Sequence, residues 1–219
     1  MIDPKLLPAI QAAVKTNEIG TASPYRLSYA RRGSSGASFG VCQGDTNTNL
    51  TARSVLRRVL MLVGVDTDTV SRVLWAVSKP CPQGCPLSAA DATVVDNALA
   101  SPGGRGLVDA MDARLMATVV SGVESCLAVA GRRGLTIAPE ALLYIALWVN
   151  MSGVPTTLCG WLAGTPEIGL APPTGPAVTR DDLKTYLTAT AYFTAHPGAM
   201  AHIDEAVASA RPLLPVAQG

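Results

Sequence analysis

Residues 18–45 read EIGTASPYRLSYARRGSSGASFGVCQGD, and they separate an N-terminal helix from a long helical region. Glycines lie at positions 20, 33, 36, 40 and 44 of this stretch, among many serines and threonines. Apolar and polar residues alternate over 25–30 and again over 38–43, which predicts two short strands joined by a turn at 31–36. We find no comparable β pattern elsewhere in the sequence, so this stretch predicts the only sheet.

The rest of the chain has the periodicity of helices. Asp3 and Pro4 are typical of a helix start, and the apolar stripe that follows them predicts a helix to about residue 16. From residue 50 onward apolar positions recur every three or four residues, and glycines and prolines divide the chain into about eight helices. Residues 107–130 are apolar on nearly every side, which predicts a buried central helix.

These patterns predict an α+β fold that is predominantly α. An N-terminal helix and a small β-hairpin region, with the β region at residues 19–49, precede a helical bundle around the buried central helix. The helical lobe spans residues 50–219. No internal repeat and no linker-like segment interrupts the chain, so we predict a single domain over residues 1–219 and a monomer.

Composition excludes several classes of protein. With 48% apolar residues and a net charge of +1, the chain is not intrinsically disordered. Lys and Arg (17) nearly balance Asp and Glu (16), so the chain lacks the electrostatic footprint of a nucleic-acid-binding protein. An aromatic share of 5% also argues against base-stacking platforms. We therefore predict no nucleic-acid partner.

The sequence predicts neither a secretory signal nor a membrane span. The first 20 residues include Asp3 and Lys5 and lack the uninterrupted apolar run of a secretory signal. The longest apolar run, residues 141–149, is about half of what a membrane span needs. We predict synthesis in the cytoplasm, and action outside it would need a delivery partner such as a holin or a secretion apparatus.

Five cysteines lie at positions 42, 81, 85, 126 and 159. Their odd number and their wide spacing argue against a disulfide framework. Cys81 and Cys85 are close enough in sequence for a local disulfide or for two zinc ligands. Neither histidine, His196 or His202, has the spacing of a zinc motif. Unpaired or buried thiols are the favoured interpretation, and we predict no metal and no other cofactor.

A carboxylate at the end of the first helix, Glu18, makes the glycine-rich stretch a candidate site. Glycines let a ligand approach the backbone closely, and the Ser, Thr, Tyr, Gln and Asp side chains offer hydrogen bonds that suit sugar hydroxyls. An apolar bundle behind Glu18 would raise the pKa of its carboxyl, so that it could act as a general acid.

This pattern resembles the lysozyme-like superfamily. Phage-type lysozymes place a catalytic Glu at the end of the first helix, before a small β-hairpin region and a helical lobe, and Ser38-Phe39-Gly40 is similar to their Thr-Ile-Gly strand. The stretch from Gly36 to Gln43 also resembles the Gly-Ala-x-Gly-Leu-Met-Gln strand of soluble lytic transglycosylases. Residues 147–153 and 158–162 are similar to the Phe-Asn-x-Gly…Leu-x-x-x-Leu helix pair of phage-type lysozymes. Together these matches cover about a fifth of the chain.

The resemblance implies a glycoside hydrolase that cleaves the bond between N-acetylmuramic acid and N-acetylglucosamine in peptidoglycan. Such an enzyme lyses bacterial cell walls, as a phage endolysin or as a contact-delivered antibacterial effector. Glu18 would protonate the leaving oxygen, and Asp45 would activate water or stabilise the oxocarbenium-like state. The substrate-binding residues would be Tyr25, Ser38, Gln43 and Asn150.

The sequence departs from this family at the second carboxylate. Phage-type lysozymes carry an Asp about nine residues after the Glu, where this chain has Leu27, and no acidic residue occurs between Glu18 and Asp45. A hairpin can return Asp45 towards Glu18, and paired carboxylates act at separations of roughly 5–9.5 Å. Without Asp45, Glu18 would act first as acid and then as base, as in lytic transglycosylases. The sequence is also compatible with a chitosanase-like glycosidase, and with a non-catalytic sugar-binding or structural module of a phage or secretion assembly.

Each candidate residue also has a purely structural interpretation. Glu18 could be a solvated helix end, and Asp45 a turn or N-cap residue. Gln43 could brace the hairpin, and Asn150 could be a buried structural amide that needs hydrogen-bond partners.

Two more carboxylates and three tryptophans bear on the same site. Glu124 and Glu140 lie within or at the start of apolar helices, and they are the next carboxylates to test if Glu18 is not the acid. The three tryptophans lie in apolar helical periods and are predicted in the core rather than as sugar platforms: Trp75, Trp148 and Trp161.

Overall fold

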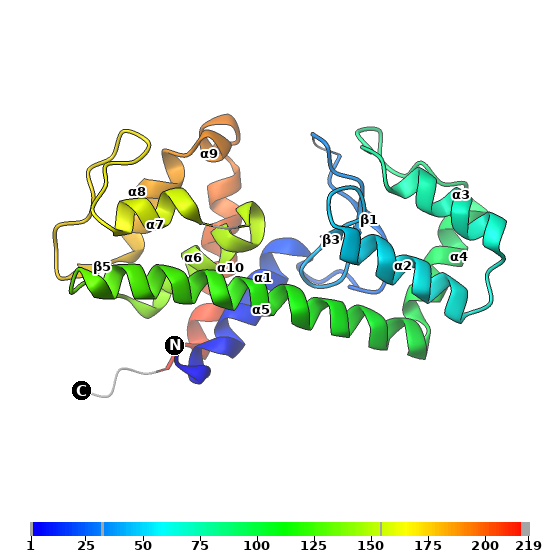
Figure 1. Cartoon of the computed structure of the whole chain (residues 1–219), viewed down its shortest axis with the longest axis horizontal. Helices are drawn as coiled ribbons and strands as arrows, with labels where there is room; N and C mark the ends of the chain where they lie inside the picture. Colours follow the sequence, from blue (N-terminus) through cyan, green and yellow to red (C-terminus); the bar gives the residue numbers. More distant parts are fainter. Residues whose placement is uncertain (1, 32, 154, 216–219) are drawn as a thin grey trace. The chain divides into compact units, whose positions relative to one another are not determined.

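The computed structural model describes residues 2–31, 33–153 and 155–215 (Figure 1). Over these residues the chain is predominantly helical, with ten α-helices and a small antiparallel sheet, which confirms the predicted class of α+β, predominantly α. The chain divides into two compact units. The helical unit comprises Met1–Gly20 and Met116–Gly219, and the hairpin unit is Thr21–Leu115.

The sheet of the hairpin unit has three short strands in the order β1-β2-β3. β1 (Ser28–Tyr29) pairs antiparallel with β2 (Ala37–Phe39), and β2 pairs antiparallel with β3 (Gly44–Asp45). All three residues of the central strand are buried. All three strands therefore lie within residues 19–49, the predicted β region.

The number of strands differs from the prediction. The second predicted strand, residues 38–43, is interrupted because the backbone enters the left-handed region at Gly40 and at Gln43, with φ of 83° and 50°. A Cβ at Gly40 would lie 2.5 Å from Oδ1 of Asp112, so only glycine fits this turn. Arg32, which belongs to the predicted turn, lies outside the described residues.

Three helices and the first part of a fourth complete the hairpin unit. They are α2 (Leu50–Leu62), α3 (Thr67–Val77) and α4 (Ala89–Ala100), and α2 packs against α3, α4 and β3. The side chains of three N-cap residues accept hydrogen bonds from first-turn amides: Asn49, Asp66 and Ser88. The apolar core of the unit includes Phe39, Leu56, Leu60, Val73, Leu99 and Met111.

The long helix α5 (Pro102–Arg132) contributes to both units, which divide between Leu115 and Met116. It begins at Pro102 rather than at the predicted residue 107, because Ser101 acts as its cap. The Oγ atom of Ser101 accepts a hydrogen bond from the amide of Gly104 at 3.0 Å. The glycines that predicted a longer break are therefore part of the first helical turn.

α5 was predicted to be a buried central helix, but only part of its surface is buried. In its second half the buried residues form one stripe at every third or fourth position: Met116, Val119, Val123, Cys126 and Ala130. Within the described residues, α5 is also the one helix long and apolar enough to cross a membrane, with a mean hydropathy of 1.4 over 18 residues, of which 28% are buried. A stripe with this spacing is typical of a helix that packs one face against a protein core.

The helical unit begins with the short 3-10 helix Pro4–Leu6 and α1 (Leu7–Glu18). α1 packs against α6 (Pro139–Ser152) and α10 (Ala199–Ala210), and Figure 1 shows α1 and α10 side by side. The buried residues of α1 form one stripe: Ala9, Ile10, Ala13 and Val14. This packing fixes the end of α1, where Glu18 lies.

Within the described residues, four further helices complete the helical unit. α8 (Arg180–Thr188) packs against α6 and begins with a capping box, in which Thr179 and Asp182 bond each other's backbone amides. The remaining elements are α7 (Thr156–Leu162), α9 (Ala191–Ala195) and a final 3-10 helix, Arg211–Leu213.

A second, two-stranded sheet was not predicted. β4 (Thr136–Ile137) and β5 (Ala177–Val178) pair in parallel within the helical unit. Strands of two residues are too short to produce an alternating pattern in the sequence.

The grouping of the elements also differs from the predicted division into a β region and a helical lobe. α2, α3 and α4 pack with the small sheet rather than with the later helices. The hairpin unit is large enough to bury a core of its own. The single domain over residues 1–219, with its β region at 19–49 and its lobe at 50–219, stays a prediction.

Candidate functional site

The carboxyl of Glu18 lies half-buried at the C-terminal end of α1, in the helical unit. Its Oε1 atom accepts hydrogen bonds from Nδ2 of Asn17 and from Nδ2 of Asn150, each at 2.9 Å. Asn150 comes from α6, 132 positions further along the chain. The packing of α1 on α6 thus brings two predicted site residues into direct contact.

Burial raises the pKa of the Glu18 carboxyl above its usual value, and the hydrogen bonds from Asn17 and Asn150 oppose this rise without cancelling it. The C-terminal end of a helix carries partial negative charge, which acts in the same direction as burial. A carboxyl with a raised pKa retains its proton closer to neutral pH, which is what a general acid requires.

The two oxygens of Glu18 are not equivalent. Both of the amide donors, Nδ2 of Asn17 and Nδ2 of Asn150, bond Oε1. In the protonated acid, amide N–H groups favour the carbonyl oxygen as their acceptor, so the proton belongs on Oε2. This arrangement orients the proton away from the two asparagines and makes it available to an acceptor oxygen.

Asp45, the predicted second catalytic carboxylate, lies in β3 and accepts hydrogen bonds from three backbone amides. Its oxygens bond the amides of Gly36 at 3.2 Å, Asn47 at 2.7 Å and Thr48 at 3.2 Å. These contacts join the two ends of the β2–β3 hairpin. They match the structural interpretation of Asp45 as a turn residue, and its catalytic role stays a prediction.

Gln43 and Ser38, predicted to bind substrate, both have structural contacts within the sheet. Nε2 of Gln43 donates to the carbonyl of Gly40 at 3.0 Å, and its Oε1 accepts a hydrogen bond from Oγ of Ser28. Ser38 is buried in the central strand, opposite Ser28 on one side and Asp45 on the other. In this geometry the amide of Gln43 fixes the hairpin turn.

Asp112, in the first half of α5, is a carboxylate of the hairpin unit that the sequence did not single out. Its Oδ2 accepts from the amide of Val41 at 2.7 Å and its Oδ1 from the amide of Cys42 at 3.1 Å. Burial raises the pKa of Asp112, while these two amides act to lower it. A long-range contact of this kind leaves no local pattern, because the partners are about 70 positions apart.

Tyr25, also predicted to bind substrate, is held by another carboxylate of α5. Its hydroxyl donates to Oδ1 of Asp109 at 2.8 Å, and the guanidinium of Arg105 lies 5.1 Å from the centre of its ring. Nearby, the amide of Leu27 donates to Oδ1 of Asp96 in α4 at 2.9 Å. Carboxylates of α4 and α5 therefore anchor the segment that leads into the sheet.

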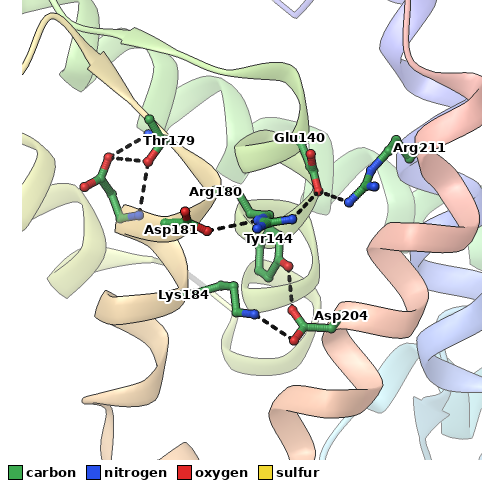
Figure 2. Close-up of polar contacts among 9 residues, drawn as sticks. Glu140, Tyr144, Thr179, Arg180, Asp181, Lys184, Asp204 and Arg211 are labelled. Atoms are coloured by element: carbon green, nitrogen blue, oxygen red, sulfur yellow. Dashed lines mark hydrogen bonds and ion pairs between the residues drawn. The ribbon is translucent and has the colours of Figure 1, made fainter.

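Glu140 is one of the two carboxylates to test if Glu18 is not the acid. It forms two ion pairs in the helical unit (Figure 2). Its Oε1 lies 2.6 Å from Nη2 of Arg211 and 3.6 Å from Nη1 of Arg180. The other such carboxylate, Glu124, accepts a hydrogen bond from the amide of Ile2 at 3.1 Å. Both carboxylates therefore have structural contacts, and they stay the next carboxylates to test after Glu18.

The three tryptophans occupy different environments. Trp161 is buried, as predicted, and donates from its indole N–H to the carbonyl of Ala171. Trp148 is half-buried. The prediction that Trp75 lies in the core is wrong, because 68% of it is exposed, with Nζ of Lys79 3.1 Å from the centre of a ring.

Two further features bear on ligand binding. Within the described residues, no three His, Cys, Asp or Glu side chains lie close enough together to hold a metal ion. The hairpin unit has an open, mainly apolar hollow of about 550 Å³, and none of the predicted site residues lines it. Its lining consists of Arg58, Met61, Leu62, Gly103, Gly106 and Leu107.

The near-zero net charge of the chain conceals an uneven distribution. The hairpin unit carries ten Lys and Arg against seven Asp and Glu, a net charge of +3. The helical unit carries seven against nine, a net charge of −2. The positive charge is therefore concentrated in the unit that contains the glycine-rich sheet.

No family model matches the chain, and no match was found among curated proteins or solved structures.

Proposed function

We propose that this protein is a lysozyme-like glycosidase that cleaves the glycan strands of peptidoglycan, with Glu18 as the general acid. The observation that carries the proposal is the state of the Glu18 carboxyl. It is half-buried, its pKa is raised, and both of its hydrogen-bond donors converge on Oε1. Cleavage of a glycosidic bond needs a carboxylic acid that is still protonated near neutral pH and can donate to the leaving oxygen.

The order of elements supports the same proposal. The helix α1 ends at Glu18, a small glycine-rich sheet follows, and the rest of the described chain is mainly helical. Asn150, taken from the second segment that resembles phage-type lysozymes, bonds the proposed acid. The net charge of +3 on the hairpin unit would favour approach to an anionic wall polymer.

The contacts of Asp45 favour a second candidate mechanism on the same acid. A carboxylate that already bonds three backbone amides is poorly placed to accept a proton from water. Glu18 would then act alone, first as the acid and afterwards as the base that draws a proton from a sugar hydroxyl. That hydroxyl attacks the anomeric carbon of its own sugar, as in lytic transglycosylases, and the product carries an anhydro end.

The chemistry of the new glycan ends distinguishes these candidates. Purified sacculi are incubated with wild type and with Glu18→Gln, Asp45→Asn and Glu205→Gln, and the released muropeptides are analysed by mass spectrometry. Glu205→Gln is the matched control, because Glu205 is an exposed carboxylate of the helical unit. Reducing ends that disappear in Glu18→Gln and in Asp45→Asn support hydrolysis by two carboxylates. Anhydro ends that disappear only in Glu18→Gln support the transglycosylase.

Two further outcomes would replace the proposal. Sedimentation of the protein with sacculi, without any new ends from wild type, would indicate a non-catalytic binding module. Cleavage of chitosan with no cleavage of sacculi would indicate a chitosanase-like glycosidase. The proposed site of action is the cell wall, reached from the cytoplasm with the help of a holin or a secretion apparatus.

A further inference from the structure

Two cysteines of the helical unit face each other across different helices. Cys126 lies in α5 and Cys159 in α7, and their Sγ atoms are 3.7 Å apart. They are 33 positions apart in the sequence, so the contact results from tertiary packing. Two sulfurs in a disulfide are about 2.05 Å apart. A shift of less than 2 Å would therefore suffice to join this pair.

The sulfur atoms of the other three cysteines contact oxygen atoms. Sγ of Cys81 points to the carbonyl of Lys79 at 3.1 Å, and Sγ of Cys85 to the hydroxyl of Tyr29 at 3.2 Å. Sγ of Cys42 lies 3.9 Å from the backbone oxygen of Asp112. Within the described residues, Cys126 and Cys159 are the pair whose sulfurs lie in contact.

We propose that Cys126 and Cys159 are a disulfide-forming site, oxidised by a small-molecule or protein disulfide in an oxidising compartment. The bond would tie α5 to α7 and close a loop that contains the whole of α6. This inference is independent of the proposed glycosidase activity, because it depends only on the two sulfurs and on access to an oxidant.

Exposure decides which sulfur reacts first. Cys126 is fully buried, and burial together with the neighbouring Cys159 raises the pKa of its thiol. Cys159 is half-buried and is the sulfur that an oxidant can reach. The Cys159 thiolate attacks the oxidant disulfide, which forms a mixed disulfide and releases one thiol. Cys126 then loses its proton and attacks the Cys159 sulfur, which releases the second thiol.

The step is balanced. Two protein thiols lose two electrons and two protons, and the oxidant disulfide gains them as two thiols. Reactions of this type require attack in line with the sulfur–sulfur bond and a thiolate as nucleophile. Cys159→Ala removes the reachable sulfur and should protect Cys126 from the oxidant. Cys126→Ala should leave Cys159 trapped as the mixed disulfide.

Peptide mapping after oxidation with glutathione disulfide tests the site directly. Trypsin cleavage after Arg114, Arg132, Arg133 and Arg180 places Cys126 on peptide 115–132 and Cys159 on peptide 134–180. Cys81 and Cys85 share another peptide, so their disulfide would link no two peptides. The proposal predicts a linked pair of 115–132 with 134–180 in wild type, absent from both single variants. Cys85→Ala is the control and should retain the linked pair.

Thermal unfolding gives a second readout. Closing a loop of this length should raise the Tm of the oxidised protein over the reduced protein by up to about 10 °C. The rise should persist in Cys85→Ala and vanish in Cys159→Ala. The proposal is overturned if Cys126 and Cys159 are both alkylated in denatured, fully oxidised protein. It is also overturned if the linkage found joins other cysteines.

Discussion

The environment of a single residue, Glu18, determines how the protein should respond to pH. Burial raises the pKa of Glu18 in the folded state. The folded protein therefore binds more protons than the unfolded chain between about pH 4.5, the ordinary value for Glu, and the raised pKa. Stability is therefore lost as pH rises through this window. Glu18→Gln removes the ionisable group, so we expect the variant to be more stable than wild type at pH 7.

Urea unfolding at several pH values checks this expectation. The stability difference between Glu18→Gln and wild type should shrink as pH falls towards 4, where wild-type Glu18 is protonated in both states. Glu205→Gln, an exposed carboxylate in the same unit, should show no such trend. A Glu18→Gln variant less stable than wild type at pH 7 would show that the carboxylate is stabilising.

The two asparagines that bond Glu18 lead to a second prediction. Each donates to Oε1 and so favours the charged form of the carboxyl. Asn150→Ala should raise the pKa of Glu18 further, and Asn17→Ala should act in the same direction. The pKa is measured from the pH dependence of the Glu18 side-chain carboxyl signal by NMR. An unchanged or lowered pKa in Asn150→Ala would contradict the geometry of this site.

At the residue scale, two of the predicted site residues contact each other. Glu18 was singled out by its place at a helix end before the glycine-rich stretch, and Asn150 by the resemblance of its helix to that of phage-type lysozymes. Their contact could not be predicted, because it depends on how α1 packs on α6. Asp112 was missed for the same reason, since its partners, Val41 and Cys42, lie far from it in sequence.

At the scale of elements, the turn between β2 and β3 depends on a glycine at position 40. Gly40 has φ of 83°, and a Cβ there would lie 2.5 Å from Oδ1 of Asp112. Gly33 also has positive φ, of 50°, but a Cβ there would meet nothing within 4 Å. Alanine at position 33 would therefore introduce backbone strain alone, whereas alanine at position 40 would introduce both strain and a steric clash.

Gly33→Ala should cost roughly 1 kcal/mol in the free energy of unfolding, as expected for an alanine with positive φ. Gly40→Ala should cost roughly 3 kcal/mol or more, because Asp112 must move and the amides of Val41 and Cys42 lose their acceptor. Urea unfolding followed by circular dichroism measures both. Equal costs for the two variants would contradict the described position of Asp112.

The start of a capped helix depends on a local interaction, which the sequence can indicate. α3 and α4 begin directly after Asp66 and Ser88, whose side chains accept hydrogen bonds from amides of the first turn. The start of α5 was placed too late, since Gly103 and Gly104 were interpreted as a break although Ser101 can cap a helix that contains them. The small parallel pair of β4 and β5 depends on tertiary contact alone.

At the scale of the whole molecule, an ion network in the helical unit should control acid stability (Figure 2). Asp204 accepts hydrogen bonds from the hydroxyl of Tyr144 at 2.6 Å and from Nζ of Lys184 at 2.8 Å. Burial tends to raise the pKa of Asp204, but these bonds and the charges of Lys184 and Arg180 outweigh it, so the pKa is lowered. The network joins α6, α8 and α10.

The lowered pKa gives Asp204 a contribution to stability that is present above about pH 3.8, the ordinary value for Asp, and is lost as pH falls below it. Asp204→Ala should cost roughly 1–3 kcal/mol at pH 7, because the buried hydroxyl of Tyr144 loses its acceptor. Thermal unfolding between pH 2.5 and pH 7, values chosen on either side of this range, measures the effect. Glu205→Ala is the control and should change little, and an equal loss in both variants would argue against the network.

The overall fold class followed from composition and periodicity, whereas the organisation of the chain did not. Apolar periods identify helices, but they do not say which helices pack with the sheet. The net charge of +1 likewise concealed the difference between the basic hairpin unit and the acidic helical unit. Both features depend on tertiary structure, in which residues 1–20 pack with residues 116–219.

The most direct test of the central claim is the rate at which wild type and Glu18→Gln produce new glycan ends from purified peptidoglycan. If Glu18 is the general acid, Glu18→Gln should lower this rate by roughly 10²–10⁴-fold, while the variant remains folded and still binds sacculi. Glu205→Gln should keep the wild-type rate. A Glu18→Gln variant that cleaves peptidoglycan as fast as wild type would contradict the claim.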